Sequence, residues 1–399
     1  MDRNYDAVAA GHVCLDIIPA ISDTGARGFG DLLRPGKLLH TGPVVVNTGG
    51  PVSNTGIALR KLGASVLFCA RTGGDAFGRI TLDLLQRSGN ADGVRLVEES
   101  ASSYTIVLAP PGIDRVFLHN PGANDDFGPE DIDPDLPAQA RLFHFGYPPL
   151  MKRMYADGGL ELERVFRIAR DAGATTSCDM ALPDPDSDAG QAPWRAILER
   201  VLPHVDIFLP SVEEALYMVE PDAFLAMKRA HGGAELIEHL TPDDYLRIAD
   251  ALLGYGAGVV SLKSGDRGFF LKTADANRLR SFGAARPADV EPWADRTLWG
   301  PALSAPNIAS ATGSGDSSIA GFLMAFLRGE PPETAVATAN CVGWQNVQAL
   351  DAVSGVRSWE ETRGLMASAM PVNDAGVAQS GWRWDDKDRV WYGPGDPRY

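Results

Sequence analysis

Apolar and polar positions along the chain follow two alternating patterns. Short apolar runs typical of strands are separated by longer stretches in which apolar residues recur every three or four positions, as in helices. The strand-like runs lie at residues 6–10, 66–70, 105–109, 142–145, 207–209 and 258–262. Because strands that alternate with helices usually form a mostly parallel sheet covered by helices, the pattern predicts an α/β fold.

Three segments stand apart from this alternation. The sequence YTIVLAPPGIDRVFLHN at 104–120 predicts two strands joined by a PPGID turn, a hairpin that could protrude as a small β-lid. Residues 216–240 suggest inserted helices, and residues 282–307 look like an excursion from the core. The tail at 371–399 also looks like an excursion, but its aromatic-rich sequence GWRWDDKDRVWY favours packing on the body over a flexible linker.

Composition narrows the function classes. With 399 residues, 45% of them apolar, the chain can bury a large core. A net charge of -16 argues against nucleic-acid partners and anionic membranes, which require a basic surface. The longest apolar run, residues 319–327, is about half of a membrane span. The acidic N-terminus does not resemble a signal peptide, and the four separated cysteines fit buried free thiols, so a cytoplasmic location is expected.

The strongest chemical signal is the sequence ATGSGD at 311–316. The apolar residues that follow it recur at helical spacing, so a helix is expected to begin near Asp316 and to end at Gly329. A helix N-terminus preceded by small residues presents free N–H groups to an anion, as a transferring phosphoryl group requires. Asp316 could there accept a proton from an attacking hydroxyl. The alternative interpretation is that Asp316 only caps the helix.

A second signal is the sequence NTGGPVSN at 47–54, which leads into another helical segment. Two adjacent glycines allow a ligand to approach the backbone, and Asn54 can donate to and accept from a polyol hydroxyl. Asp16 follows the first strand, where carboxylates often bind sugar hydroxyls. A capped glycine turn and a solvated loop acid are the alternative interpretations.

Together these residues resemble the ribokinase-like (PfkB) family of carbohydrate kinases, from about residue 6 to residue 356. The N-terminal signature of the family is similar to residues 49–79, which include GDAFG at 74–78. The C-terminal signature is similar to residues 311–329. The resemblance implies a doubly wound, three-layer α/β/α domain over residues 1–370, a β-lid contributed mainly by about 12–50 and 100–125, and a C-terminal extension at 371–399 that is packed or partly flexible.

The resemblance also implies roles for individual residues. Asp316 matches the catalytic base, and Gly313, Ser314 and Gly315 match the backbone anion hole. The expected sugar-binding positions are Asp16, Gly49, Gly50 and Asn54. On the nucleotide side, the matched positions are Lys263 and Gly265 beside the nucleotide, Asn340 near the adenine, and Glu214, which influences Mg²⁺ through water.

The chain departs from the family pattern at two positions. Ser211 replaces the Asn of the Asn-x-x-Glu motif that ends at Glu214, so the magnesium arrangement is expected to differ. Ser310 replaces an Asp that often contributes to a monovalent-cation site. Because a charge is missing there, potassium activation is expected to be weak.

The predicted function is transfer of the γ-phosphoryl group of Mg-ATP to a hydroxymethyl group of a small carbohydrate. A nucleoside kinase of the same family and a non-catalytic sugar or nucleotide sensor remain alternatives. No Walker A sequence is present, and GYGAGVV at 254–260 runs into a strand instead of following one, which argues against a dinucleotide site. Further residues near the substrate, each also explicable as packing, are His12, Tyr104, His119 and Tyr147. A homodimer through paired lids is expected from the exposed strand edges.

Overall fold

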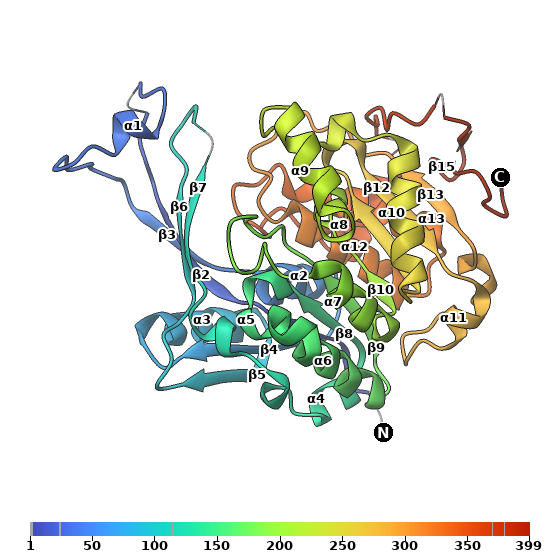
Figure 1. Ribbon diagram of the computed structural model, residues 1–399, viewed down its shortest axis with the longest axis horizontal. Coiled ribbons are helices and arrows are strands. Elements are labelled where there is room, and N and C mark those ends of the chain that lie inside the picture. The colour runs from blue at the N-terminus through green and yellow to red at the C-terminus, as the bar shows by residue number, and fades with distance from the viewer. Residues whose placement is uncertain (1–2, 24, 114, 369, 379) are drawn as a thin grey trace.

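The computed structural model describes residues 3–23, 25–113, 115–368, 370–378 and 380–399. Within these ranges the chain forms one large sheet flanked by helices and a separate small sheet (Figure 1). The small sheet stands out from the body at one side, and the C-terminal extension lies at the opposite side. The predicted α/β fold with a lid is therefore confirmed.

The large sheet has eleven strands within the described residues, and seven adjacent strands, from β5 to β11, run parallel. Its spatial order is β14 (Arg383–Asp385), β15 (Val390–Tyr392), β13 (Thr297–Gly300), β12 (Phe269–Thr273), β11 (Val259–Lys263), β10 (Ile207–Phe208), β9 (Thr175–Asp179), β8 (Ala140–Gly146), β1 (Tyr5–Gly11), β4 (Val66–Gly73) and β5 (Asn90–Val97). Five of the six predicted strand runs fall on strands of this sheet.

The small sheet forms the lid. In spatial order its strands are β3 (Val44–Gly49), β2 (Cys14–Pro19), β6 (Tyr104–Leu108) and β7 (Val116–Asn120). Strands β6 and β7 pair antiparallel, as the 104–120 sequence predicts. Strand β2 continues from β1 after two residues, so the lid is joined directly to the carboxyl end of a central strand.

Helices cover both faces of the large sheet. Alternate residues of β1 enter different cores: Val8 and Ala10 pack on one face, Ala7 and Ala9 on the other. The first core contains side chains of α5 (Lys152–Tyr155), α6 (Leu160–Asp171), α7 (Trp194–Val201), α8 (Val212–Val219), α9 (Pro221–Ala230) and α10 (Pro242–Gly254). The second contains those of α2 (Pro51–Lys61), α3 (Ala76–Ser88), α11 (Ala276–Arg280), α12 (Ser314–Leu327), α13 (Pro332–Asn346) and α14 (Trp359–Ala367). Two short helices, α1 (Phe29–Leu32) and α4 (Asp135–Ala138), complete the set.

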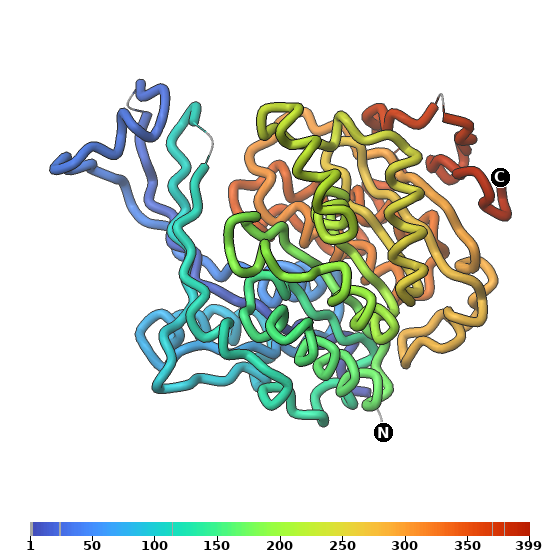
Figure 2. The backbone as a smooth tube through the Cα atoms, viewed as in Figure 1, coloured from blue at the N-terminus to red at the C-terminus, as the bar shows by residue number. Residues whose placement is uncertain are grey.

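One sequence interpretation is wrong in part. The segment 282–307, expected to leave the core, contains β13, whose four residues are all buried in the large sheet. Its few residues flanked by Pro and Gly give too short an apolar run to be recognised as a strand. The tail lies against the body (Figure 2) and its strand β15 pairs with β13. Its side chains Trp382 and Tyr392 are buried.

Candidate functional site

The carboxylate of Asp316 lies in the first turn of α12, beneath the carboxyl ends of the central strands. The helix begins at Ser314, after Gly313 in the left-handed conformation (φ 70°). Asp316 is only 3% exposed. Asn54 Nδ2 donates to its Oδ2 at 3.0 Å, and Thr55 Oγ1 donates to its Oδ1 at 3.4 Å. The predicted helix start near Asp316 is confirmed.

Tyr147 is a third donor to this carboxylate. Its hydroxyl lies 3.1 Å from each oxygen of Asp316. The backbone of Tyr147 is left-handed (φ 62°), an uncommon conformation for a bulky residue that often marks a functional position. Two prolines follow directly, and they fix the turn that leaves β8. The turn after β8 thus places the hydroxyl donor of Tyr147 beside Asp316, which belongs to α12.

Burial determines the protonation behaviour of Asp316. Desolvation raises the pKa of its carboxyl group, whereas the hydrogen bond from Asn54, the charge of Lys263 and the hydroxyls of Tyr147 and Thr55 oppose the rise. The net direction is upward. A carboxylate with a raised pKa is a better proton acceptor than an exposed aspartate.

The two adjacent glycines bring the start of α2 against the beginning of the lid. A Cβ atom on Gly49 would lie 2.4 Å from Oδ2 of Asp16, and one on Gly50 (φ 86°) would lie 2.6 Å from Nδ1 of His12. No larger residue fits at either position without movement. Burial raises the pKa of Asp16 to about 6. The structure therefore gathers Asp16, both glycines and Asn54, and Asn54 connects this group to Asp316.

A lysine and two carboxylates border the glycine turn on the other side. Lys263, at the end of β11, forms an ion pair with Asp179 at 2.5 Å, and its Cδ would lie 3.5 Å from a Cβ on Gly315. Glu214 accepts a hydrogen bond from the backbone N–H of Ser211 at 2.6 Å in a capping box. Burial raises the pKa of Asp179 and of Glu214, and the charge of Lys263 opposes both shifts.

The remaining residues that were expected on the nucleotide side lie further along the same edge of the sheet. Gly265 (φ 52°) is in the turn after β11, and Asn340 Nδ2 donates to the carbonyl of Gly300 at 2.9 Å. Lys263, Phe269 and Gly300 are in register on three adjacent strands. At roughly 4.8 Å per strand, Gly300 lies about 10 Å from Lys263. No hydrogen bond joins Gly265 or Asn340 to Asp316 within the described part of the chain.

Between the lid and the body lies a cavity of about 890 Å³. Its polar lining includes Asp16 and Asn47 from the lid strands and Thr312 and Asp351 from the body. Arg115, which directly precedes β7 at the turn of the hairpin, donates to Oγ of Ser310 at 3.3 Å and to Oγ1 of Thr312. Ser310, which stands where the family often has an aspartate, therefore has a guanidinium group beside it.

Four other residues were singled out from the sequence because of their ring side chains. The His12 and His119 rings are 5.3 Å apart, and the His12 and Tyr147 rings are 6.2 Å apart. Tyr104 packs on Phe77 at 5.5 Å. Burial lowers the pKa of His12 to about 3, so its ring is neutral. Neither ring nitrogen has a hydrogen-bond partner among the described residues, an uncommon situation for buried polar atoms.

Sequence reasoning missed Thr55, Asp179 and Arg115. Thr55 lies at the start of a helix, and Asp179 lies at the end of a buried strand. Because ligands often bind beyond the ends of strands and at helix starts, each position could have suggested a site residue. Arg115 meets Ser310 across 195 residues of sequence, and no local pattern signals such a contact.

In the portion of the chain that the structure describes, no group of three or more His, Cys, Asp or Glu side chains is arranged to hold a metal ion. Nor is any helix there long and apolar enough to cross a membrane. The cysteines Cys14, Cys69, Cys178 and Cys341 are free and buried.

Comparison with known proteins shows which family the chain resembles. The chain is 24% identical over 301 residues to an uncharacterized sugar kinase of Archaeoglobus fulgidus, covering 75% of this chain and 98% of that protein. It is 26% identical over 222 residues to fructokinase-2 of Oryza sativa subsp. japonica, covering 54% of this chain and 60% of that protein. The solved structure of Arabidopsis thaliana ribokinase complexed with ribose and ATP superposes with a TM-score of 0.66 at 18% identity, covering 92% of this chain and 99% of that chain.

The family model described as "pfkB family carbohydrate kinase" matches residues 8–359, which include every candidate site residue named from the sequence. The C-terminal extension lies beyond the matched residues. The protein belongs to the pfkB family of carbohydrate kinases and is a phosphotransferase of the sugar-kinase type.

Proposed function

We propose that this chain transfers the γ-phosphoryl group of Mg-ATP to a hydroxymethyl group of a small carbohydrate, with Asp316 as the base. The observation that carries the proposal is the position of Asp316. Its carboxylate is buried in the first turn of α12, one residue after Gly315, with a raised pKa. A proton acceptor and the free N–H groups of a helix N-terminus thus lie side by side.

The acceptor hydroxyl has to reach a carboxylate that Asn54, Thr55 and Tyr147 already surround. These neutral donors hold the carboxylate in one orientation. Their hydrogen bonds and the charge of Lys263 lower the pKa of Asp316, but burial outweighs them and leaves the pKa raised. The acceptor hydroxyl then takes the place of one donor, and Asp316 accepts its proton as the oxygen–phosphorus bond forms. The Gly313–Gly315 amides stabilise the negative charge on the transferring group.

Polar groups near the lid support a polyol substrate. Asp16 would accept hydrogen bonds from sugar hydroxyls, and Asn54 can both donate and accept. The unpartnered ring nitrogens of His12 would gain a partner from a bound hydroxyl. Gly49 and Gly50, which lack side chains, allow Asp16 and His12 to lie directly against the start of α2.

The nucleotide would lie along the edge that runs from Lys263 to Asn340. Lys263 adjoins Gly315 and provides a positive charge beside the phosphates, and Gly265 and Asn340 lie further along. Mg²⁺, when bound, would neutralise charge on the nucleotide phosphates. The buried Oδ2 of Asp179 has no hydrogen-bond partner among the described residues, and Glu214 is nearby. Two such carboxylates suit an ion that keeps most of its water ligands.

A nucleoside is the second candidate acceptor, and the lid cavity favours it. Besides its polar groups the cavity is lined by Ile57, Leu84, Val107 and Phe117. Its volume of about 890 Å³ lies within the roughly 300 to 1,000 Å³ that larger ligands occupy. Such an apolar surface would suit the base of a nucleoside better than a bare hexose.

The test is a screen for ADP release from Mg-ATP. The acceptors are pentoses, hexoses, sugar phosphates, ketodeoxy sugar acids, polyols and nucleosides. One class is expected to release ADP in step with formation of its phosphate ester. If ATP binds but no acceptor is phosphorylated, the catalytic proposal is wrong and the sensor interpretation stands.

A further inference from the structure

The C-terminal extension lies against both turns that border the expected nucleotide site. Ser304 N–H donates to the carbonyl of Pro371 at 2.9 Å, and Asn373 N–H donates to the carbonyl of Ala302 at 2.8 Å. These residues join the extension to the loop that leads from β13 to the glycine turn at Gly313. Asn373 Nδ2 also donates to the carbonyl of Asp266 at 3.0 Å, in the turn that contains Gly265.

A cavity of about 230 Å³ lies between the extension and α13. On one side it is lined by family-matched residues, among them Gly300, Leu303, Thr334, Ala337 and Asn340. On the other side it is lined by residues beyond the family match: Leu365, Met366, Met370, Val372, Lys387, Asp388 and Arg389. About half of the lining residues therefore lie beyond the residues that the family model matches.

The size and position of the cavity suit one part of a nucleotide. Pockets for whole drug-sized ligands have volumes of roughly 300 to 1,000 Å³, so a cavity of about 230 Å³ takes a smaller group. Gly300 lies about 10 Å from Lys263 on the same sheet edge, by the strand spacing given above. With phosphates at Gly315, the base of the nucleotide would reach this cavity.

The lining has the chemistry of a base pocket. Met366 and Met370 supply flexible, polarisable side chains, which make favourable contacts with aromatic rings. The amide oxygen of Asn340 remains available because its Nδ2 is engaged by Gly300. A flat apolar group with polar edges would fit between these surfaces.

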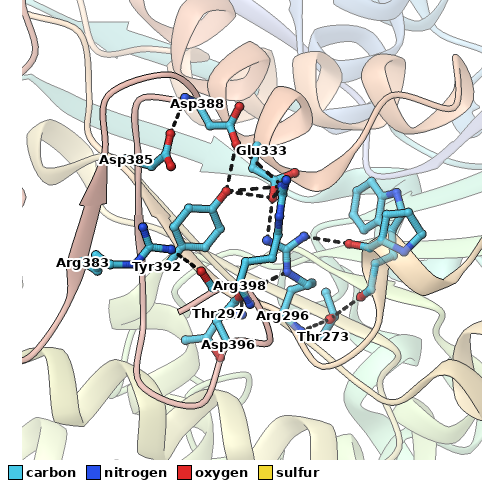
Figure 3. Close-up of polar contacts among 12 residues, drawn as sticks. Thr273, Arg296, Thr297, Glu333, Arg383, Asp385, Asp388, Tyr392, Asp396 and Arg398 are labelled. Carbon is cyan, nitrogen blue, oxygen red and sulfur yellow. Dashed lines mark hydrogen bonds and ion pairs between the residues drawn. The ribbon is translucent and has the colours of Figure 1, made fainter.

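A buried ionic cluster holds the extension in place (Figure 3). Arg296 is 2% exposed and pairs with Asp396 of the extension at 3.0 Å and with Glu333 at 2.5 Å. Arg398 and the hydroxyl of Tyr392 also donate to Glu333, at 2.7 Å and 3.2 Å. Because Glu333 is in the first turn of α13, the cluster anchors the extension to the helix that carries Asn340.

We infer that Arg389 of the C-terminal extension, Met370 directly before the extension and Met366 of α14 form one wall of the pocket for the nucleotide base. This inference rests on the proposed function. The alternative is that the extension only covers β13, which would otherwise be the edge of the large sheet. A purely structural cover predicts no effect of these side chains on nucleotide affinity.

The experiment compares two tryptophan variants at neighbouring positions of α14. Met366→Trp would fill the cavity, whereas Ala367→Trp adds the same ring at an exposed position that does not line it. Binding of ATP and of base-free tripolyphosphate, each with Mg²⁺, is measured by calorimetry. Met366→Trp is expected to weaken ATP binding about tenfold or more, a loss of about 1.4 kcal/mol, and to leave tripolyphosphate binding unchanged. Ala367→Trp is expected to change neither.

Two results would overturn the inference: unchanged ATP affinity in Met366→Trp, or equal weakening of ATP and tripolyphosphate. If Met366→Trp does not fold, peroxide oxidation of the wild-type methionines decides. Saturating ATP, but not tripolyphosphate, should slow oxidation of Met366 and Met370, and equal oxidation rates would overturn the inference. A wild-type protein that binds no ATP would instead refute the proposed function, and this inference with it.

Discussion

Two buried carboxylates in this protein have opposite surroundings. Asp316 receives hydrogen bonds from the neutral groups of Asn54, Thr55 and Tyr147, and burial leaves its pKa raised. Glu333, 4% exposed, receives hydrogen bonds from Arg296 and Arg398. Burial alone would raise the pKa of Glu333, but the two guanidinium groups lower it.

The difference separates the proposed catalytic carboxylate from a carboxylate that joins two segments of the fold. A carboxylate surrounded by neutral donors stays basic enough to accept a proton, and it costs folding free energy to keep ionised at neutral pH. A carboxylate paired with arginines is ionised over a wider pH range and fixes the segments that it joins. Both carboxylates lie within the family-matched residues, but Glu333 pairs with Arg398 of the C-terminal extension, which lies beyond them.

The largest effect on folding is expected from breaking the Glu333 cluster. Glu333→Gln leaves Arg296 buried with Asp396 as its remaining anion, so the expected cost is that of the lost charge-assisted hydrogen bonds, about 1.5 to 3 kcal/mol. Urea unfolding should therefore show a loss of this size, while kcat at saturating substrates stays within about twofold of wild type. An unfolding free energy unchanged from wild type would show that the cluster is not a structural anchor.

Tyr147→Phe should act on chemistry more than on folding. The variant loses a hydrogen bond to a charged group, an interaction of about 1.5 to 3 kcal/mol that favours the ionised form of Asp316. The pKa of Asp316 should rise further, so the acid limb of the kcat/KM profile should move to higher pH by about one pH unit or more. An unmoved acid limb, with kcat lowered equally at every pH, would contradict this role for Tyr147.

The pH dependence of stability should reveal the lowered pKa of Glu333. The pKa of Glu333 in the folded protein is below its ordinary value of 4.5. Its contribution to stability is therefore complete above pH 4.5 and is lost as pH falls through the lowered folded-state pKa. As pH falls from 4.5 to about 3, wild type should lose more stability than Glu333→Gln, as measured by thermal unfolding. Parallel curves for the two proteins would argue against the assignment.

The smallest effect is expected from potassium. Ser310 carries no charge, and Arg115 from the lid donates to it and to Thr312. We predict that replacing K⁺ by tetramethylammonium at constant ionic strength changes kcat by less than about twofold. Strong activation by K⁺ would show that a monovalent cation binds without a carboxylate at this position.

Much of the fold and part of the site follow from local sequence patterns. The strand runs, the 104–120 hairpin and the start of α12 are each specified by consecutive residues, and the structure has them. Strand β13 was not predicted because four residues are too few to show the alternation of a strand. The ionic cluster around Glu333 was not predicted from the sequence, for a different reason. It joins residues up to 100 positions apart, and only tertiary packing brings them together.

The same limit applies at the site. Asn54 and Asp316 could be named because each lies at the start of a predicted helix, but their 3.0 Å contact spans 262 residues. The direction in which Tyr147 points depends on its left-handed backbone conformation. That conformation is uncommon for a tyrosine and cannot be predicted from the sequence.

The most direct test of the central claim is Asp316→Asn, with catalysis and stability measured on the same preparation. Asparagine keeps the size of the side chain but accepts no proton. We predict that kcat falls by roughly 10² to 10⁴-fold with little change in ATP affinity, while the unfolding transition of the same preparation shows that the variant is folded. Near-normal turnover in the folded variant would contradict the account.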